Sequence, residues 1–462
     1  MGTTRDERNV AGRVRPTYEQ LLAENLALKR QVEKLTRLVE KLRRQARRQA
    51  APFRKQDEPV RKAKKPGRKS GRRHGRHGQR SVPPRIDESH DVPLPTQCPH
   101  CGGHVTETHV AVQYQTEIPR TVIYRQFEIH VGRCDGCGRT VEGRHDLQTS
   151  AARGAAASQL GPNVHAALAI LNKQLGLSHG KSVKLLSALF EKLSLARATS
   201  VRSIRRTAER CRPAYQQLRQ DLRSASEVAP DETGWRVEGR NAWLHAFVSS
   251  RSTCYVIDPT RGPQPAEQLL GQDWPGTLVH DGWSIYDRFA CAWHQQCVRH
   301  LQRRCQGLLE TTIRGAVRLP RAVLALIDQA FSLRRAWRGH RLSGDALAEQ
   351  GLALSCELER LASGRFTFAP NRRLARHILN HAMHWFWFLI DPKIAATNYR
   401  AEQAIRPAVV NRKVWGGNRT WPGAASQSIL TSVLRTCEQR ALTAYDFLIA
   451  AIRSPETQLL PA

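Results

Sequence analysis

Apolar residues recur every seven positions near the start of the chain. The two seams of this heptad pattern are Leu21, Leu28, Leu35 and Leu42, and Tyr18, Asn25, Val32 and Val39. The spacing predicts a leucine-zipper-like coiled coil within residues 1–50. Asn25 is a polar seam residue that favours a parallel pair of helices, so we expect a homodimer or a higher oligomer. The alternative is an amphipathic helix that docks on its own protein.

Helical spacing of apolar residues returns between Gly161 and Ser224. The positions are Leu168, Leu171, Leu175, Val183, Leu186 and Leu189. They predict a helical domain over residues 155–225. Two helices, 182–192 and 199–211, are compatible with a helix-turn-helix whose second helix presents Arg202, Arg205 and Arg206 to DNA. The alternative is a helix pair that serves only packing.

A strand-like pattern begins after Pro230. The predicted elements are strands at 231–237, 242–248 and 254–257, a helix at 265–271 and a buried strand at 276–283. Three strands, a helix and a further strand indicate an RNase H-like α/β catalytic core, whose first part spans residues 226–290. In that fold the first and fourth strands lie side by side.

A mostly helical insertion is predicted over residues 291–392, because Leu324, Ile327 and Phe331 follow helical spacing. We expect it to cover DNA. The aromatic cluster Trp385 to Phe388 is interpreted as core packing, with a base-stacking platform as the alternative. The second part of the core and the C-terminal helices then occupy 393–454. The predicted fold class is therefore multidomain α+β.

Two C-x-x-C pairs lie in the segment 91–148. They are Cys98 and Cys101, and Cys134 and Cys137. A segment rich in strand-forming residues separates them, including Val110, Val112, Tyr114, Val122, Ile123, Tyr124 and Phe127. Four thiolates on two tight turns predict a zinc ribbon that binds DNA, with Zn²⁺ in a structural role. A redox-active pair is the alternative for any single C-x-x-C.

The charge balance points to a polyanionic partner. Lys and Arg number 73 and Asp and Glu 40, for a net charge of +33, and this excess favours nucleic acid. Much of it lies in residues 51–90, predicted to be a basic disordered arm that contacts phosphates through Arg68, Lys69, Arg72 and Arg73. A solvated linker is the alternative.

The targeting signals that would indicate a membrane or secreted protein are lacking. The richest apolar run, Trp385 to Ile390, is far shorter than the roughly 18 residues of a membrane span. The first residues contain no apolar signal core. Eleven cysteines, an odd number, are more compatible with reduced thiols and a metal site than with a disulfide framework. We therefore expect a cytoplasmic protein.

Three carboxylates form the candidate catalytic and metal site. Adjacent first and fourth strands would bring Asp231 and Asp281 together, and such juxtaposed acids require cations. Glu402 flanks the apolar helical face of Ala401, Ala404 and Ile405. Carboxylate oxygens suit Mg²⁺ or Mn²⁺, and a metal pair promotes phosphoryl transfer without a protein nucleophile. Phosphate contacts are expected from nearby basic residues: Arg400, Arg406, Arg412 and Lys413.

These motifs, in this order, resemble the insertion-sequence-66 (IS66) family of bacterial transposases. The residues that carry the resemblance are Asp231-Glu232-Thr233, His280-Asp281-Gly282-Trp283 and Ala401-Glu402-Gln403-Ala404-Ile405-Arg406-Pro407. The resemblance implies a DDE transposase in which Asp231, Asp281 and Glu402 bind the metals. It also implies terminal inverted repeats and target DNA as substrates, and small accessory proteins of the same element as partners.

Two segments depart from the family pattern. Tyr399 occupies the place of an Asn in the Asn-x-x-Glu-x-x-x-Arg-Pro motif, with Asn398 just before it. The run Trp415 to Thr420 replaces the loop expected of commoner members, which indicates a divergent subgroup.

Cys291, His294, Cys297 and His300 have a spacing of three residues that suggests a second zinc site. We interpret the segment as helical, so that four such steps sweep round the helix and do not converge on one metal. Cys297-Val298-Arg299-His300 instead resembles the family's C-x-x-H motif near the active site. His300 and Arg303 are therefore expected to have a structural or DNA-contacting role.

Two other functions remain open. A dimeric zinc-binding regulator would share the coiled coil, the arm and the zinc ribbon, but has no need of three acids in a cationic chain. An RNase H-like nuclease would cut DNA without joining it.

Overall fold

The computed structural model describes residues 17, 20, 27, 28, 31, 82–91, 93, 95, 97, 100–104, 110, 112–116, 121–150, 152, 159–311 and 314–454. Two compact units are distinguished, Met1–Thr116 and Glu117–Ala462, and each is considered by itself. Most of the predicted coiled coil lies outside the described residues, although Gln20, Ala27, Leu28 and Gln31 are helical. The basic arm lies outside them as far as Ser81.

The second unit begins with a short two-stranded sheet. Strands β1 (Val131–Arg133) and β2 (Thr140–Glu142) pair antiparallel on either side of the Cys134–Cys137 turn. Strand β1 lies at the end of the segment between the two C-x-x-C pairs, which is rich in strand-forming residues. At the described positions 110, 112–116 and 121–130 the chain is not in a strand, and Val110, Ile123 and Tyr124 are exposed. Strand-forming residues need a paired neighbour to form a sheet.

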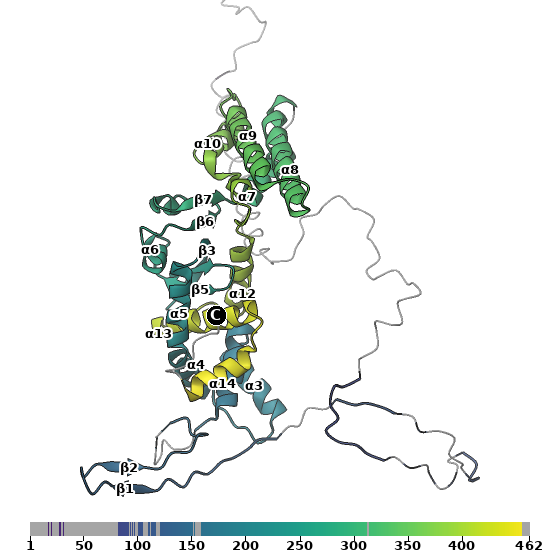
Figure 1. The fold of residues 1–462 in the computed structure, drawn as a ribbon, viewed down its shortest axis with the longest axis vertical. Helices are drawn as coiled ribbons and strands as arrows, with labels where there is room; N and C mark the ends of the chain where they lie inside the picture. The colour runs from purple at the N-terminus through teal and green to yellow at the C-terminus, as the bar shows by residue number, and fades with distance from the viewer. Residues whose placement is uncertain are drawn as a thin grey trace, which may run out of the picture. The chain divides into compact units, whose positions relative to one another are not determined.

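A helical layer follows and shares its core with the end of the chain. Its elements are α2 (Pro162–Ala169), the π-helical turn η2 (Ile170–Gln174), α3 (His179–Leu189), α4 (Arg197–Arg210) and α5 (Arg212–Arg223). Ser178 caps α3 by accepting a hydrogen bond from the amide of Lys181. One hydrophobic cluster joins these helices to α13 (Trp421–Gln439) and α14 (Ala444–Arg453), which lie beside them in Figure 1.

A five-stranded mixed sheet forms the centre of the unit. Its strands are β3 (Glu227–Val237), β4 (Arg240–Val248), β5 (Thr253–Asp258), β6 (Thr277–His280) and β7 (Trp293–Gln296). The order is β5-β4-β3-β6-β7, with β3 antiparallel to β4 and parallel to β6. The predicted succession of three strands, a helix and a strand is present, and the first and fourth strands are neighbours.

Strand β7 corrects the sequence prediction. The sequence places residues 293–296 in a helical insertion, but they pair parallel with β6 at the edge of the sheet. The strand is only four residues long and its buried side chains are Gln295 and Gln296. Buried glutamines lack the apolar alternation by which strands are recognised in a sequence, so the pattern gives no sign of this one.

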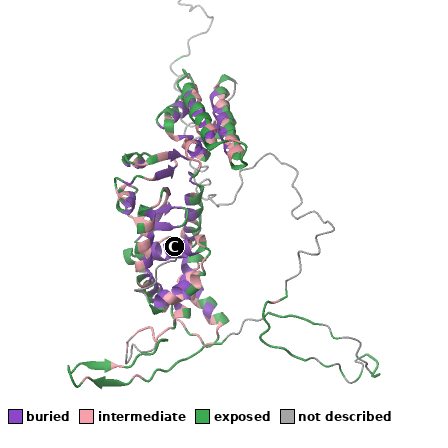
Figure 2. Cartoon of the chain, viewed as in Figure 1, coloured by how far each residue is buried: buried purple, intermediate pink, exposed green. Residues whose placement is uncertain are grey.

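Helices pack on both faces of the sheet (Figure 2). On one face α12 (Tyr399–Trp415) contributes Ala401, Ala404, Ile405 and Ala408 to a cluster that includes Trp235. On the other face α5 and α6 (Gln264–Leu270) bury Leu222 and Leu269 against strand residues. The apolar face predicted around Glu402 is therefore confirmed.

The segment between β7 and α12 is mostly helical, as predicted. It contains α7 (Val298–Thr311), α8 (Arg318–Arg338), α9 (Gly344–Ala362), α10 (Ala369–Leu379) and α11 (Trp387–Ile390), and the short 3-10 turns Arg314–Val317 and Ala382–His384. These helices share their own hydrophobic cluster. Trp385, Phe386 and Phe388 are buried in it, so core packing of these aromatics is confirmed. No described helix is long and apolar enough to cross a membrane.

Candidate active site

The sheet brings together Asp231, a residue of β3, and Asp281, which directly follows the neighbouring strand β6. Glu227 and Val228 of β3 pair with Thr277 and Leu278 of β6, and each acid follows its strand's first paired residue by four positions. Asp231 also pairs across β4 with Ala246, a residue of the cluster beneath α12. Side chains alternate between the faces of a strand, so both carboxylates are on the α12 side of the sheet.

The proton affinity of Asp231 reflects this crowding. Burial raises the pKa of Asp231 to about 7, and the negative charges of Glu232, Asp281 and Glu402 contribute to the increase. The amide of Glu232, which donates a hydrogen bond to Oδ1 at 2.9 Å, acts in the opposite direction. Asp231 is therefore within the electrostatic field of both other predicted acids, one from the end of β6 and one from α12.

Glu402 lies in the first turn of α12, next to buried Ala401. Its side chain remains about one-third exposed. Oε1 accepts a hydrogen bond from Nη2 of Arg303 on α7 at 2.5 Å, and Nε2 of His300 is 3.6 Å away. The third carboxylate is thus held by a cation from a helix that lies 99 residues earlier in the sequence.

His300 and Arg303 form one unit beside this carboxylate. Nη2 of Arg303 lies 3.2 Å from Nε2 of His300. Burial and the charge of Arg303 lower the pKa of His300, while Asp281 and Glu402 partly compensate. The imidazole therefore lies within the field of two of the three acids. The sequence predicts a structural or DNA-contacting role for both residues, and the structure places them at the candidate active site.

The segment from Cys291 to His300 was predicted to be helical, and this prediction is wrong. The four residues considered as a second zinc site lie in a turn, a strand, the residue before α7 and α7 itself. Cys291 lies in the exposed turn before β7. His294 belongs to β7, where Nδ1 lies 3.1 Å from Nε2 of His280. Cys297 is buried before α7 and its sulfur accepts a hydrogen bond from the amide of Asn398. Only His300 is helical among them.

A buried cluster around Glu232 was not predicted. Its carboxylate is almost fully buried and accepts two hydrogen bonds from Arg261, at 2.6 and 3.1 Å, and one from the hydroxyl of Tyr286. The guanidinium of Arg261 lies over the rings of Trp243 and Trp283, at 4.8 and 3.9 Å from their centroids. Adjacency to Asp231 in the sequence was the only signal for Glu232. The cluster fixes the middle of β3 from the face opposite to α12.

The divergent segment after α12 anchors that helix to β3. Gly416 ends α12 in the left-handed conformation, and the amide of Asn418 donates to the carbonyl of Arg236 at 2.9 Å. Oδ1 of Asn418 accepts a hydrogen bond from the indole of Trp235 at 2.8 Å. The segment that departs from the family loop therefore holds the helix of Glu402 against the strand of Asp231.

The donor set suits a hard divalent cation. Carboxylate oxygens are the ligands that Mg²⁺ and Mn²⁺ prefer, and Asp231 lies in a field of negative charge that a cation would relieve. Within the described residues, no three His, Cys, Asp or Glu side chains already converge as a metal site does. Arg303 holds Oε1 of Glu402, so a metal ion that bound this oxygen would have to displace the ion pair.

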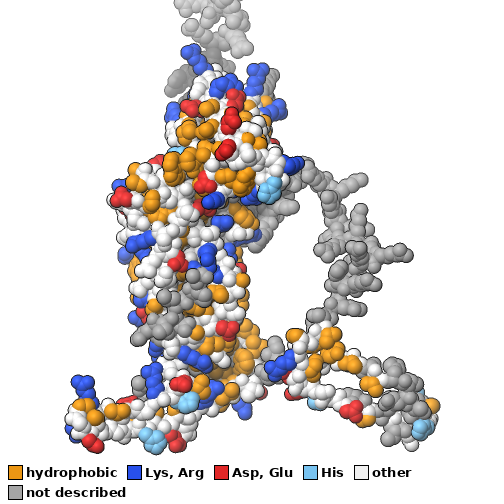
Figure 3. Space-filling view, in the orientation of Figure 1, with side chains coloured by type: hydrophobic (Ala, Val, Ile, Leu, Met, Phe, Trp, Pro, Cys, Tyr) orange, Lys and Arg blue, Asp and Glu red, His pale blue; other side chains and the backbone are white. Residues whose placement is uncertain are grey.

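The predicted phosphate-binding residues have different surroundings. Arg400 is half exposed and pairs with Glu227 at 3.4 Å, while Arg406 and Lys413 are exposed along α12. Arg412 is half-buried, with its guanidinium close to Gly234 of β3. The arm residues Arg68, Lys69, Arg72 and Arg73 lie outside the described residues. Lys and Arg side chains are spread over the visible face of the second unit (Figure 3).

The predicted helix-turn-helix corresponds to α3 and α4. Arg202, Arg205 and Arg206 are all exposed on α4. The opposite face of that helix is buried through Ile204 and Ala208. The basic face is thus accessible, and a role in DNA recognition stays a prediction.

The predicted zinc ligands fall in both units. Cys98 lies outside the described residues and Cys101 belongs to the first unit. In the second unit, hydrogen bonds from Cys137 and from the amide of Gly136 lower the pKa of Cys134. A turn whose amides point at a thiolate is typical of zinc knuckles. The zinc ribbon stays a prediction.

A model of the IS66 transposase family matches residues 157–426, which is more than half of the chain. The chain belongs to this family of DDE-class transposases. The match begins just before α2, ends within α13 and includes all three candidate acids. No curated protein sequence matches the chain. A transposase role follows from the family, and members of the DDE class generally use divalent metal ions.

Proposed function

We propose that this IS66 transposase cleaves DNA at terminal inverted repeats and transfers the freed strand to target DNA, using Asp231, Asp281 and Glu402 as its metal ligands. The observation that carries the proposal is the arrangement of the acids: Asp231 lies on β3, Asp281 follows the neighbouring strand β6, and Glu402 comes from α12, which packs on the same face of the sheet. Asp281 and Glu402 are close enough to contribute to the raised pKa of Asp231. Three acids from separate segments of one sheet-and-helix unit thus share one electrostatic environment. Strained clusters of like charge are typical of functional sites.

The bound metal ions, Mg²⁺ or Mn²⁺, would supply an activated oxygen nucleophile and stabilise the leaving oxygen. Asp231, which is paired within β3, and Asp281, which directly follows β6, provide two ligands from neighbouring strands. Glu402 completes the set from α12 once it leaves Arg303. The guanidinium of Arg303, beside His300, would then be free to contact the scissile phosphate and neutralise its charge.

The remaining parts of the chain are assigned DNA-binding and assembly roles. The mixed sheet with α12 and α13 is the RNase H-like core, whose first part extends through β7 to Gln296, and the helices between β7 and α12 cover bound DNA. The four cysteines hold structural Zn²⁺ in the 91–148 domain. The arm contacts phosphates, and the coiled coil assembles the oligomer. Small proteins encoded by the same element act as accessory partners.

The test uses a supercoiled plasmid that carries the inverted repeats flanking this gene, incubated with the full-length protein and Mg²⁺. We expect nicks at the repeat ends and joined products. Asp231→Asn, Asp281→Asn and Glu402→Gln should each lower cleavage by about 10³-fold or more, because each removes a metal ligand. Repeat-end binding should persist in all three.

Asp273→Asn is the matched control, because Asp273 is exposed in the loop before β6, at the opposite end of that strand from Asp281. It should cleave like the wild type. Nicks without joined products would favour a nuclease. Binding without any nick, unaltered by the three substitutions, would favour a regulator and refute the proposal.

A further inference from the structure

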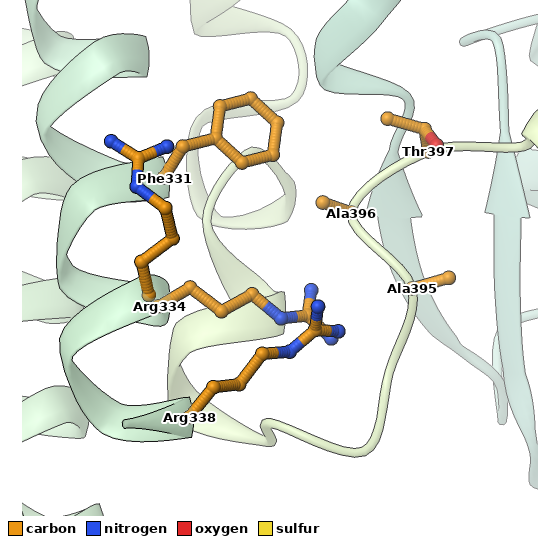
Figure 4. Close-up of a pocket in the computed structure, with 7 residues that line it drawn as sticks. Phe331, Arg334, Arg338, Ala395, Ala396 and Thr397 are labelled. Atoms are coloured by element: carbon orange, nitrogen blue, oxygen red, sulfur yellow. The ribbon is translucent and has the colours of Figure 1, made fainter. Parts of the chain in front are cut away.

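A cationic pocket lies between the last turns of α8 and the segment that leads into α12. Its volume is about 270 Å³. The lining residues are Phe331, Arg334, Arg335, Arg338, Ala395, Ala396 and Thr397. Figure 4 shows the guanidinium groups of Arg334 and Arg338 side by side, directed toward Ala395. Three arginines within two turns of a single helix thus line one wall of the cavity.

The positive charge of this pocket is not neutralised by an ion pair. Among the residues that the structure describes, no carboxylate forms a salt bridge with Arg334, Arg335 or Arg338. Burial and the neighbouring charge of Arg338 lower the pKa of Arg334, while the carboxylates of Glu227 and Asp391 act in the opposite direction. Like charges held together in this way are stabilised when an anion binds.

Arg334 also retains an unused donor. It is only 8% exposed, and Nη2 donates to the carbonyls of Pro392 and Ile394, at 3.0 and 2.6 Å. Its Nε has no partner among the described residues. Buried donors are normally satisfied, so Arg334, which lines the cavity, has capacity for a further acceptor.

The wall opposite α8 is continuous with the active-site helix. The amide of Ala395 donates to Oε2 of Glu227 at 2.7 Å. Glu227 precedes Asp231 by four residues of β3, which corresponds to about 13 Å along the strand. Thr397 is followed by Asn398, whose carbonyl accepts from the amide of Glu402 at 3.1 Å. A ligand in the pocket would therefore lie within a few nucleotides of the reacting phosphate.

We propose that this pocket binds a backbone phosphate of the DNA substrate, a few nucleotides from the scissile bond. Arg338 donates to the phosphate oxygens, the guanidinium of Arg334 lies beside it as a second positive charge, and Arg335 adds charge at the rim. Guanidinium groups match phosphate geometry and bind it through charge-assisted hydrogen bonds. The pocket thereby fixes the register of the duplex relative to the three acids. This inference rests on the proposed function in one respect, because it takes DNA as the substrate.

The experiment measures binding of the full-length protein to a repeat-end duplex in EDTA, by fluorescence anisotropy at several salt concentrations. We expect Arg338→Gln to weaken binding about 10-fold, as for removal of one charged hydrogen bond, and Arg335→Gln/Arg338→Gln to weaken it further. The slope of log K against log salt should fall by about 1, because Arg338→Gln neutralises one phosphate fewer. Arg334 is left unchanged because it also holds the 392–394 segment.

Arg321→Gln is the control, since it removes the same charge from an exposed position at the other end of α8. A second duplex series carries a single methylphosphonate at successive positions. One position should weaken binding of the wild type, and the double variant should lose that sensitivity. The inference is wrong if Arg335→Gln/Arg338→Gln binds the duplex as tightly as Arg321→Gln does. It is also wrong if the methylphosphonate that weakens binding of the wild type weakens binding of the double variant equally. Asp231→Asn separates the two proposals. This variant should lose DNA cleavage, but its binding should remain sensitive to the same methylphosphonate position.

Discussion

Replacing Asp231 by Asn should make the metal-free protein more stable at neutral and alkaline pH while abolishing its cleavage activity. The carboxyl has a pKa of about 7 in the folded chain, against an ordinary value of 3.8. Between these values the folded protein keeps a proton that the unfolded chain has lost. Raising the pH through this range therefore costs folding free energy, and the full cost is present above pH 7.

The size of the effect follows from the two pKa values. A pKa difference of about 3 corresponds to roughly 4 kcal/mol, which is a ceiling because neighbouring acids and solvent relax. We expect Asp231→Asn to gain about 2 to 4 kcal/mol at pH 8 and almost nothing at pH 4. The Asn oxygen can still accept the hydrogen bond from the amide of Glu232. The substitution therefore removes the charge and preserves the local bonding.

Urea unfolding of the full chain in EDTA at pH 4, 6 and 8 measures this difference. The free-energy gap between Asp231→Asn and wild type should widen as the pH rises. Mg²⁺ should close the gap by stabilising only the wild type. Asp273→Asn controls for removal of an exposed carboxylate and should show no gap. If Asp231→Asn is less stable than wild type at pH 8, or if the gap is the same at pH 4 and pH 8, the electrostatic reasoning fails.

Three further predictions concern other parts of the chain. Arg303→Gln should lower the Mn²⁺ concentration needed for thermal stabilisation a few-fold, because the third carboxylate no longer has to leave an ion pair worth about 1 kcal/mol. Gly417→Ala should destabilise the fold by about 2 kcal/mol or more in urea unfolding, because its φ is +119° and a Cβ would lie 2.4 Å from the carbonyl of Arg236. Cys134→Ser should release a structural zinc ion detected by native mass spectrometry, whereas Cys356→Ser should retain it.

Each of these has an outcome that would contradict it. Unchanged Mn²⁺ dependence in Arg303→Gln would mean that the ion pair does not compete with metal. Wild-type stability of Gly417→Ala would mean that the segment after α12 does not need its close approach to β3. A wild-type protein that carries no zinc would overturn the zinc-ribbon prediction.

Short-range patterns in the sequence were sufficient for the first four strands of the sheet and for the two acids associated with them. The predicted strands at 231–237, 242–248 and 254–257 lie within β3, β4 and β5, and the predicted strand at 276–283 contains β6. The apolar face of α12 likewise follows from the spacing of its alanines. Such periodicities show which face of each element is buried, so this face can be predicted without knowing the element that packs against it.

Only the tertiary structure decided the features that depend on distant partners. Strand β7 has buried glutamines in place of an apolar pattern, and it forms because its backbone pairs with β6. The pairing of Arg303 with Glu402 and the alignment of Arg334 with Ala395 join residues far apart in the sequence. The sequence by itself determined which side chains could bind metal and phosphate, because donor chemistry is a property of each residue. Packing decided which of these side chains lie close together, and it placed Arg303 beside Glu402. Electrostatic interactions depend on distances that only the folded chain defines.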